Sequence, residues 1–492
     1  MSEPREPLRR IVVAGGGQLG VLAAIGLKRA LPRCEVVVIG LRPDRAAFAD
    51  FAATSLPFTG RLHERLGVDE MQIVQAAGGS HRLVMRYFGW GGADFAGTMA
   101  FGADIDPALR TGFARDWGGG PRNASGKRAV GSLAEVLADA GKFAVPREGE
   151  PDPFPEVDYA LRWNPAAYRD LLVSIAQRAG VIHVGGDVAG IELDGAGGVA
   201  ALSIAGGEPI AADLFVDCSG PKAQLLSRLA DWKTVDWGGT LPVREVTVAV
   251  PGSPMLSLED RTILLAHGWR SELAGRDGLQ VTFALAPDTT AEAALRALGA
   301  QPLVTLPVAP GRVTAPWIGN VVALGDAAAR FEPLGFLNLD LAHRQLDLLL
   351  EMLPGRDIQP LERAEYNRRS GLMMDAVRDT LTAHYAAPAA LQVFGKHIET
   401  SKVLDQALDQ FTRRGRMPFR EEAPFHAAEF QALLAALGFP AGISPQARAQ
   451  GPAAEDDARE KFAARANSAL AQAPSYADWM GAMLRSGPAH PG

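Results

Sequence analysis

Three short stretches, far apart in the chain, share one pattern in which an apolar strand runs directly into a glycine turn. They are residues 11–20, 212–220 and 319–328. Glycines let a backbone turn sharply and approach the phosphates of a ligand, whose charge suits the start of the following helix. The repeated pattern predicts one bound dinucleotide, FAD. It also predicts an α/β fold whose Rossmann-like FAD-binding domain, of the glutathione-reductase or hydroxylase type, is assembled from distant segments.

The first stretch carries the spacing Gly-x-Gly-x-x-Gly between a strand and a helical run over residues 22–30. This spacing alone is weak evidence, because a glycine-rich turn can form without a ligand. A further strand at residues 35–39 completes the strand–helix–strand context that the motif requires. We therefore expect the cofactor to contact Gly15, Gly17, Gln18, Leu19 and Gly20.

The third stretch is more particular to a flavin. Gly325 and Asp326 end a strand, and a helical pattern follows over residues 337–352. In many FAD proteins an aspartate at this place accepts a hydrogen bond from a ribityl hydroxyl, and the following helix points its positive end at the isoalloxazine ring. An ordinary helix N-cap would also explain Asp326. The glycine motif near the N-terminus favours the flavin site.

Composition excludes several other classes of protein. The chain is 47% hydrophobic and 21% charged, enough for a large core, and its 492 residues suffice for two to four domains. A net charge of −7 with scattered arginines argues against nucleic-acid binding. Cys34 and Cys218 cannot form a disulfide framework, and the histidines show no metal-ligand spacing. Because no long apolar run is present, we expect no membrane helix and a cytoplasmic protein.

The order of these patterns predicts three regions. The FAD-binding domain takes residues 1–45, 156–230 and 311–358, the substrate and lid region takes residues 46–155 and 231–310, and a C-terminal helical region takes residues 359–492. Residues 232–310 alternate strands with short helices and would form a substrate-domain sheet. Residues 441–460 are rich in Gly, Pro, Ala, Gln, Glu and Asp, which is typical of an exposed linker.

The chain resembles the flavin-dependent tryptophan halogenases over most of its length. The most specific matching block is Phe331-Glu332-Pro333-Leu334, and further blocks match at residues 15–20, 164–184, 212–220, 319–354 and 366–385. The resemblance implies reduced FAD delivered by a separate flavin reductase, a homodimer and a small aromatic, indole-like substrate. It implies further cofactor contacts from Val188, Leu337 and Asn338. It implies a substrate site or tunnel at Trp90, Trp269, Glu332, Pro333 and Gly335.

The residues that carry out the family's reaction are replaced here. In that family reduced flavin and dioxygen convert a halide into hypohalous acid, which crosses a tunnel to a lysine near the substrate, where a glutamate assists. The lysine position aligns to Arg82, and no lysine lies between Lys28 and Lys127. Arginine keeps the charge but cannot act as a free amine. The glutamate position aligns to Gly335.

The surroundings of these positions also differ from the family pattern. The small residues on the family's halide side align to the larger Leu337 and Asn338, and its W-x-W-x-I-P segment keeps only the tryptophan at Trp269. At the end of the second strand, where an acidic residue usually binds the adenosine ribose, this chain has Gly40. Arg42 or Asp44 could bind the ribose instead.

Three functions remain open from the sequence. The first is a halogenase-family flavoenzyme with altered chemistry on an aromatic substrate, with a halide as a possible co-substrate. The second is a FAD monooxygenase or hydroxylase that transfers oxygen directly. The third is a non-catalytic flavin-binding paralogue that works through a partner. The second and third predict no dependence on halide.

We assign the catalytic role to Arg82 and to its neighbour His81, which could donate a proton at neutral pH. A packed histidine is the more ordinary interpretation of His81. An unpaired buried cation is costly, so Arg82 should be neutralised by a protein acid, a bound anion or an acidic substrate. Glu332 is a candidate partner.

Overall fold

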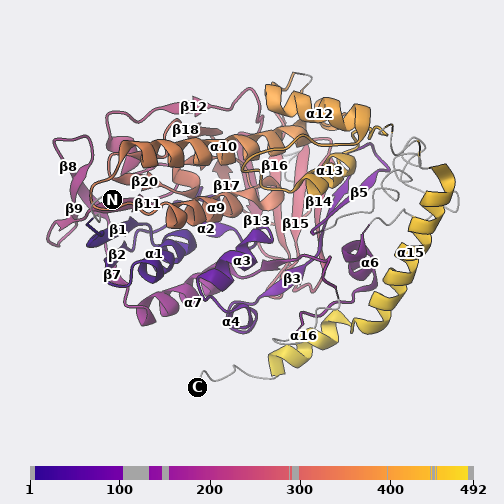
Figure 1. Cartoon of the computed structure of the whole chain (residues 1–492), viewed down its shortest axis with the longest axis horizontal. Coiled ribbons are helices and arrows are strands. Elements are labelled where there is room, and N and C mark those ends of the chain that lie inside the picture. The colour runs from indigo at the N-terminus through magenta and orange to yellow at the C-terminus, as the bar shows by residue number, and fades with distance from the viewer. Residues whose placement is uncertain are drawn as a thin grey trace.

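Two β-sheets lie side by side, and helices cover them (Figure 1). The computed structural model describes residues 6–102, 132–146, 154–287, 289–290, 298–395, 397–443, 445, 449 and 451–485. The six-stranded sheet lies towards the N-terminus in Figure 1, and the seven-stranded sheet lies between it and the C-terminal helices.

The six-stranded sheet unites the three glycine-turn stretches. Its order is β19-β20-β11-β1-β2-β7, and all neighbours are parallel except β19 and β20. The strands are β1 (Arg10–Ala14), β2 (Glu35–Ile39), β7 (Ile182–Val184), β11 (Leu214–Asp217), β19 (Trp317–Ile318) and β20 (Val321–Ala323). Parallel strands are buried on both faces, which explains their near-continuous apolar runs. The Rossmann-like arrangement predicted from the sequence is confirmed.

Helices cover this sheet, and the first of them begins directly at a predicted glycine turn. α1 (Gln18–Ala30) starts after Gly17 and packs against α7 (Pro165–Arg178) and α9 (Leu337–Glu351). α7 has both expected start signals, because the side chain of Asn164 caps it and a proline occupies its first turn. α10 (Pro360–Tyr385) packs on α9 and completes this layer.

The seven-stranded sheet draws on both segments of the expected substrate and lid region. Its order is β17-β13-β16-β15-β14-β4-β5, antiparallel except for the pair β14 and β4. The strands are β4 (Val84–Phe88), β5 (Ala96–Ala100), β13 (Glu245–Ala249), β14 (Glu259–Leu265), β15 (Gly268–Leu273), β16 (Gln280–Leu285) and β17 (Pro302–Pro307). Residues 232–287 hold strands and turns but no helix, so the alternation with short helices expected over residues 232–310 is wrong for that part, while Leu298 is helical.

Smaller elements link the two sheets. Three small sheets pair β3 (Ser80–Arg82) with β6 (Ala160–Arg162), join β8 (Val188–Leu193), β9 (Val199–Ile204) and β10 (Ile210–Ala211), and join β12 (Thr234–Asp236), β18 (Gly311–Val313) and β21 (Ala329–Arg330). Among the described residues, the other N-terminal helices are α2 (Phe48–Phe51), α3 (Phe58–Arg65), α4 (Glu70–Ala76) and α6 (Leu133–Ala140). The same part of the chain contains the 3-10 turns η1 (Leu226–Arg228), η2 (Gly325–Ala327) and η3 (Leu334–Phe336).

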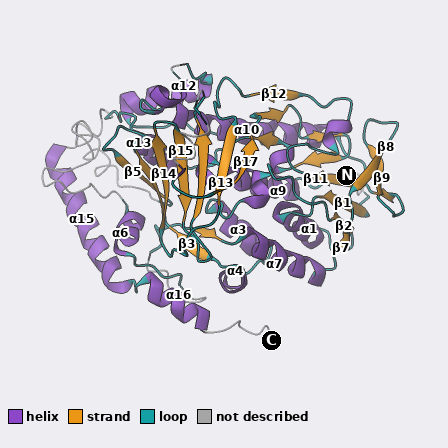
Figure 2. Ribbon diagram, turned by 180° about the vertical axis from the view of Figure 1, so that it is seen from behind, coloured by secondary structure: helices purple, strands orange, loops and turns teal. Residues whose placement is uncertain are grey.

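The C-terminal region is helical as expected, with one correction. It contains α11 (Ala390–Phe394), α12 (Lys402–Arg414), α13 (Ala427–Ala436), α15 (Gly451–Gln472) and α16 (Tyr476–Arg485). The linker expected over residues 441–460 was wrong from Gly451 onward, because the Ala, Glu and Arg of that part are good helix formers. Figure 2 shows α15 and α16 along the outside of the molecule, and α15 contacts α6. No helix of the described residues is long and apolar enough to cross a membrane.

Candidate active site

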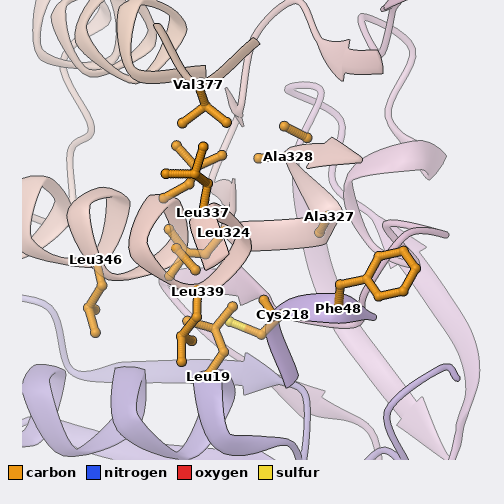
Figure 3. Close-up of a cluster of buried hydrophobic side chains, with 14 of the residues drawn as sticks. Leu19, Phe48, Cys218, Leu324, Ala327, Ala328, Leu337, Leu339, Leu346 and Val377 are labelled. Atoms are coloured by element: carbon orange, nitrogen blue, oxygen red, sulfur yellow. The ribbon is translucent and has the colours of Figure 1, made fainter. Parts of the chain in front are cut away.

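The glycine motif allows α1 to start close to β1. A Cβ at Gly20 would lie 2.1 Å from the carbonyl oxygen of Gly15, so a side chain there would push the helix off the strand. Gly17 is the N-cap of α1 and offers no side chain to cap it. The first amides of the helix therefore face the carboxyl ends of the strands, where a diphosphate would be placed. Figure 3 shows Leu19, Cys218, Leu324 and Ala327 in one buried cluster at this end of the sheet.

The short helix α2 lies against the glycine motif of residues 15–20, called the cradle below. The side-chain amide of Gln18 donates to the carbonyl oxygens of Ala49 (2.7 Å) and Ala52 (2.9 Å). The backbone N–H of Leu19 donates to a carboxylate oxygen of Asp50 at 3.1 Å. Gln18 and Leu19, both expected to contact the cofactor, are thus bonded to α2.

Asp326 stands where the sequence predicts a flavin contact. It follows β20 in the turn η2, and its Oδ2 accepts a hydrogen bond from the backbone N–H of Ala49 at 2.8 Å. Burial raises the pKa of Asp326 to about 8, and the nearby Asp50 adds to the rise. The N–H of Gly325 donates to Gln345 on α9 at 2.8 Å, which fixes the turn against the helix behind it.

The other expected cofactor contacts fall in two places. Leu337 and Asn338 are buried at the start of α9, and the Asn338 side chain donates to the carbonyl of Phe331 at 3.0 Å. Val188 begins β8 and pairs with Ile204 in a small separate sheet. Leu337 and Asn338 lie in α9, which packs against the turn η2 that holds Asp326. Val188 lies in β8, away from that turn.

Arg82 is fully buried and held on several sides. Its Nη1 lies 3.2 Å from Oδ2 of Asp260, and its Nη2 donates to the carbonyl oxygen of Ser55 at 2.6 Å. The guanidinium carbon lies 4.8 Å from the centre of the Phe336 ring and 5.1 Å from that of Phe101. Burial lowers the pKa of Arg82 to about 10, so the side chain keeps its charge at neutral pH.

Asp260 is the protein acid that neutralises this site. Its Oδ1 also accepts hydrogen bonds from Nε of Arg162 at 2.8 Å and from the N–H of Ala274 at 3.2 Å, and the side chain of Asp260 is buried. One carboxylate therefore serves two buried arginines. The expected acid partner of Arg82 exists, but it is Asp260 rather than Glu332.

Glu332 belongs to a different hydrogen-bonded chain. Its Oε1 accepts from the hydroxyl of Tyr385 at 2.5 Å, and that hydroxyl accepts from the indole N–H of Trp269 at 3.0 Å. All three side chains are buried, and burial raises the pKa of Glu332 to about 7. Its second oxygen, Oε2, has no partner among the described residues.

The turn after Glu332 carries an unusual backbone. Gly335 has φ +70°, and the following Phe336 has φ +61°, a left-handed conformation that non-glycine residues rarely adopt. Pro333 precedes the turn, and Phe336 is the N-cap of α9. The left-handed Phe336 places its ring over Arg82, so the residue after Gly335 contacts the Arg82 side chain.

His81 and Arg82 do not share a site. Successive residues of a strand point to opposite faces, and both lie in β3. The His81 ring bonds Glu70 at 2.9 Å and the Tyr476 hydroxyl at 3.0 Å, among aromatic rings that include Trp479. This arrangement ties α16 to the fold, and it leaves His81 on the face away from Asp260 and Phe336.

The two tryptophans expected at the substrate site are packed inside the fold. Trp90 and Trp269 are fully buried. The indole N–H of Trp90 donates to the carbonyl of Thr262 at 3.2 Å, and its ring lies edge-on to His384. Both indole N–H groups thus have protein partners. No group of residues suited to bind a metal ion occurs in the described part of the chain.

The sequence-based assignment missed four residues that build this region. Asp50, Ser55, Asp260 and Phe336 make the contacts given above. Only Asp260 carried a usable signal, since a buried arginine in β3 requires an acid somewhere in the sheet next to it.

The buried carboxylates predict how stability changes with pH. Asp326 and Glu332 have pKa values raised to about 8 and about 7, whereas the same carboxyls are ionised in the unfolded chain above pH 5. As pH falls from 9 to 7 the folded state therefore binds protons that the unfolded state does not. We expect the cofactor-free protein to gain roughly 1 kcal/mol per pH unit over this range.

Thermal unfolding at a series of pH values checks this expectation. Asp326→Asn should flatten the dependence between pH 9 and 7. Below about pH 6.5 the gain should level off, because burial lowers the pKa of His63 to about 4 and that of His343 below its usual value, so the unfolded chain takes up protons there that offset those still held by Asp326 and Glu332 in the folded state. A melting temperature that rises steadily from pH 7 to 9 would contradict the assignment.

Comparison with known proteins places the chain in a family. The model of the tryptophan halogenase family matches residues 10–452. Tryptophan 7-halogenase KtzQ of Kutzneria sp. is 26% identical over 77% of this chain and 76% of its own length, and tryptophan 7-halogenase RebH of Lentzea aerocolonigenes is 24% identical over 86% of each.

Solved structures agree in fold. BrvH, a flavin-dependent halogenase from Brevundimonas sp. BAL3, superposes with a TM-score of 0.83 at 23% identity, over 97% of this chain and 99% of BrvH. Xcc4156, a flavin-dependent halogenase from Xanthomonas campestris, gives 0.85 at 22% identity over the same shares. The chain belongs to the tryptophan halogenase family.

Proposed function

We propose that this protein is a FAD-dependent oxidoreductase that uses reduced FAD and dioxygen to oxidise a small aromatic, indole-like substrate, without the lysine and glutamate of tryptophan chlorination. The observation that carries the proposal is the contrast between two parts of one site. The glycine turns of β1, β11 and β20 are kept side by side, while Arg82 and Gly335 stand where the family has its reactive amine and carboxylate.

The cofactor is FAD, which a separate flavin reductase reduces in the flavin-dependent halogenases. The start of α1 suits an anion such as a diphosphate oxygen, because the N–H of Leu19 there donates to an anionic group, the Asp50 carboxylate. Gly15, Gly17 and Gly20 would let the diphosphate approach, and Asp326 would hold the ribityl chain. When bound, reduced FAD supplies the electrons that activate dioxygen.

Arg82 is a positioning residue in this proposal. A guanidinium cannot act as a free amine, and two of its nitrogens are occupied by Asp260 and Ser55. The bond to the Ser55 carbonyl ties the segment after α2 to β3. Arg82 thereby connects two segments: it bonds Ser55, which follows α2 at the cofactor cradle, and its guanidinium packs on the ring of Phe336. Gly335 offers no carboxylate to move a proton.

Two other functions are distinguished by products. A FAD monooxygenase would transfer oxygen without halide, and the glycine–aspartate turn at Gly325 and Asp326 suits that class as well. A non-catalytic flavin-binding protein would modify no substrate under any supply of reduced flavin. A homodimer and a transient complex with the reductase remain predictions.

Product analysis with indole-type substrates tests the proposal. The protein is supplied with FAD, a flavin reductase, NADH, dioxygen and catalase, with bromide or with no halide, and the products are analysed by mass spectrometry. We expect a bromide-dependent product that forms only when reduced FAD is supplied. Gain of oxygen without halide would favour the monooxygenase instead, and unmodified substrates with FAD bound would favour the non-catalytic protein. Gly17→Val serves as the control for chemistry of free flavin.

A further inference from the structure

The short helix α2 fills the space between all three glycine turns. Its Asp50 carboxylate lies where a Cβ on Gly17 would be, 2.1 Å from that position. Ala47, just before α2, lies 3.1 Å from where a Cβ on Gly220 would be, and Ala49 lies 3.6 Å from the corresponding position at Gly325. Figure 3 shows Phe48 of α2 in the same cluster as Cys218 and Ala327. Residues 47–50, the N-cap and first three residues of α2, thus touch the turns that follow β1, β11 and β20.

The groups that hold α2 are those expected to hold FAD. Gln18 bonds the carbonyls of Ala49 and Ala52, Leu19 bonds Asp50, and Asp326 bonds the N–H of Ala49. Apart from these bonds α2 is held by the burial of Phe48 and Ala49, while it has no side-chain cap and the side chain of Phe51 is half exposed. The single N–H of Leu19 has one proton to donate, so its bond to Asp50 competes with a bond to a diphosphate oxygen.

Asp50 takes the electrostatic place of a phosphate. The N-terminus of a helix favours an anion, and the buried carboxylate of Asp50 accepts the N–H of Leu19 there. The charged and titratable groups around it are Asp326 on the β20 turn, Arg169 on α7 and Cys218 after β11. Because the raised pKa of Asp326 keeps that carboxyl mostly protonated at neutral pH, Asp50 is the negative charge that an incoming diphosphate meets beside Arg169.

We propose that Asp50 is a built-in competitor of FAD: in the cofactor-free protein it occupies the diphosphate position at the start of α1, and α2 is a strap that must leave the cradle before FAD binds. The proposal rests on FAD as the cofactor and not on the reaction that the enzyme catalyses. The apparent affinity for FAD is then the intrinsic affinity multiplied by the fraction of molecules with α2 displaced. Asp50 sets that fraction.

Binding measurements on the cofactor-free protein test this. Asp50→Asn and Asp50→Ser remove the negative charge, and they should bind FAD at least about tenfold more tightly than the wild type. ADP, which brings the diphosphate without the isoalloxazine ring, should gain affinity in the same direction. Asp457→Asn removes one exposed carboxylate from the distant α15 and should leave both affinities unchanged. Calorimetric titration measures both ligands without any turnover.

Two results would overturn the proposal. The first is equal or weaker binding of FAD and ADP by folded Asp50→Asn and Asp50→Ser. The second is a crystal structure of the wild type with FAD bound in which Asp50 still accepts the N–H of Leu19. Because neither readout involves a product, loss of the proposed oxidation would leave this inference standing, and the reverse also holds.

Discussion

Replacing Asp260 by asparagine should strongly destabilise the folded protein. Asp260 is the shared counter-ion of Arg82 and Arg162, and all three side chains are buried. Asn keeps the shape but removes the charge, so two guanidinium groups are left without a neutralising partner. Breaking a buried ion pair in this way costs roughly 3–5 kcal/mol of unfolding free energy.

Urea unfolding followed by tryptophan fluorescence measures this loss. The matched control is Asp409→Asn, which removes the partner of Arg413 in a pair whose side chains are 54% and 75% exposed. Surface pairs of this kind contribute about 0.5 kcal/mol or less. If Asp260→Asn loses no more stability than Asp409→Asn, the buried network around Arg82 is not the one described.

Replacing Gly17 by valine should abolish FAD binding. The backbone of Gly17 has φ −79°, so strain is not the reason. The reason is space, because every atom beyond the Cα enters the position that Asp50 fills and that the diphosphate requires. We expect the affinity for FAD to fall by about a hundredfold or more.

The control for this change lies in an open part of the chain. A Cβ at Gly60 in α3 meets nothing within 4 Å, so Gly60→Val tests the effect of the same substitution without the clash. Flavin fluorescence quenching gives both affinities. Wild-type affinity in a folded Gly17→Val protein would show that the diphosphate does not approach this turn.

The sheet with its turns could be predicted because its signals are local. The strands β1, β11 and β20 are mostly apolar, and a glycine follows each of them within a few residues. Their sequences therefore indicated that the strands are buried and that the glycine turns lie at one edge of the sheet. Parallel pairing then places the three turns together whatever lies between them in the chain.

The site around Arg82 could not be predicted in the same way because it depends on distant partners. Asp260 is 178 residues away from Arg82, and no spacing rule connects them. The orientation of His81 depended on whether residues 80–82 form a strand, which sets His81 and Arg82 on opposite faces. The left-handed Phe336 had no signal at all, since its neighbour Gly335 is the residue that such a turn ordinarily uses.

Chlorination of free tryptophan tests the central claim most directly, namely that this chain keeps the family's FAD site and lacks its amine and carboxylate. The protein, with FAD binding verified by its visible spectrum, is incubated with tryptophan, chloride, dioxygen and reduced FAD from a flavin reductase, beside a flavin-dependent tryptophan halogenase as positive control. We predict that tryptophan is recovered unchlorinated while the control is converted. Robust formation of chlorotryptophan by this protein would contradict the claim, because Arg82 and Gly335 would then support the reaction for which the family uses lysine and glutamate.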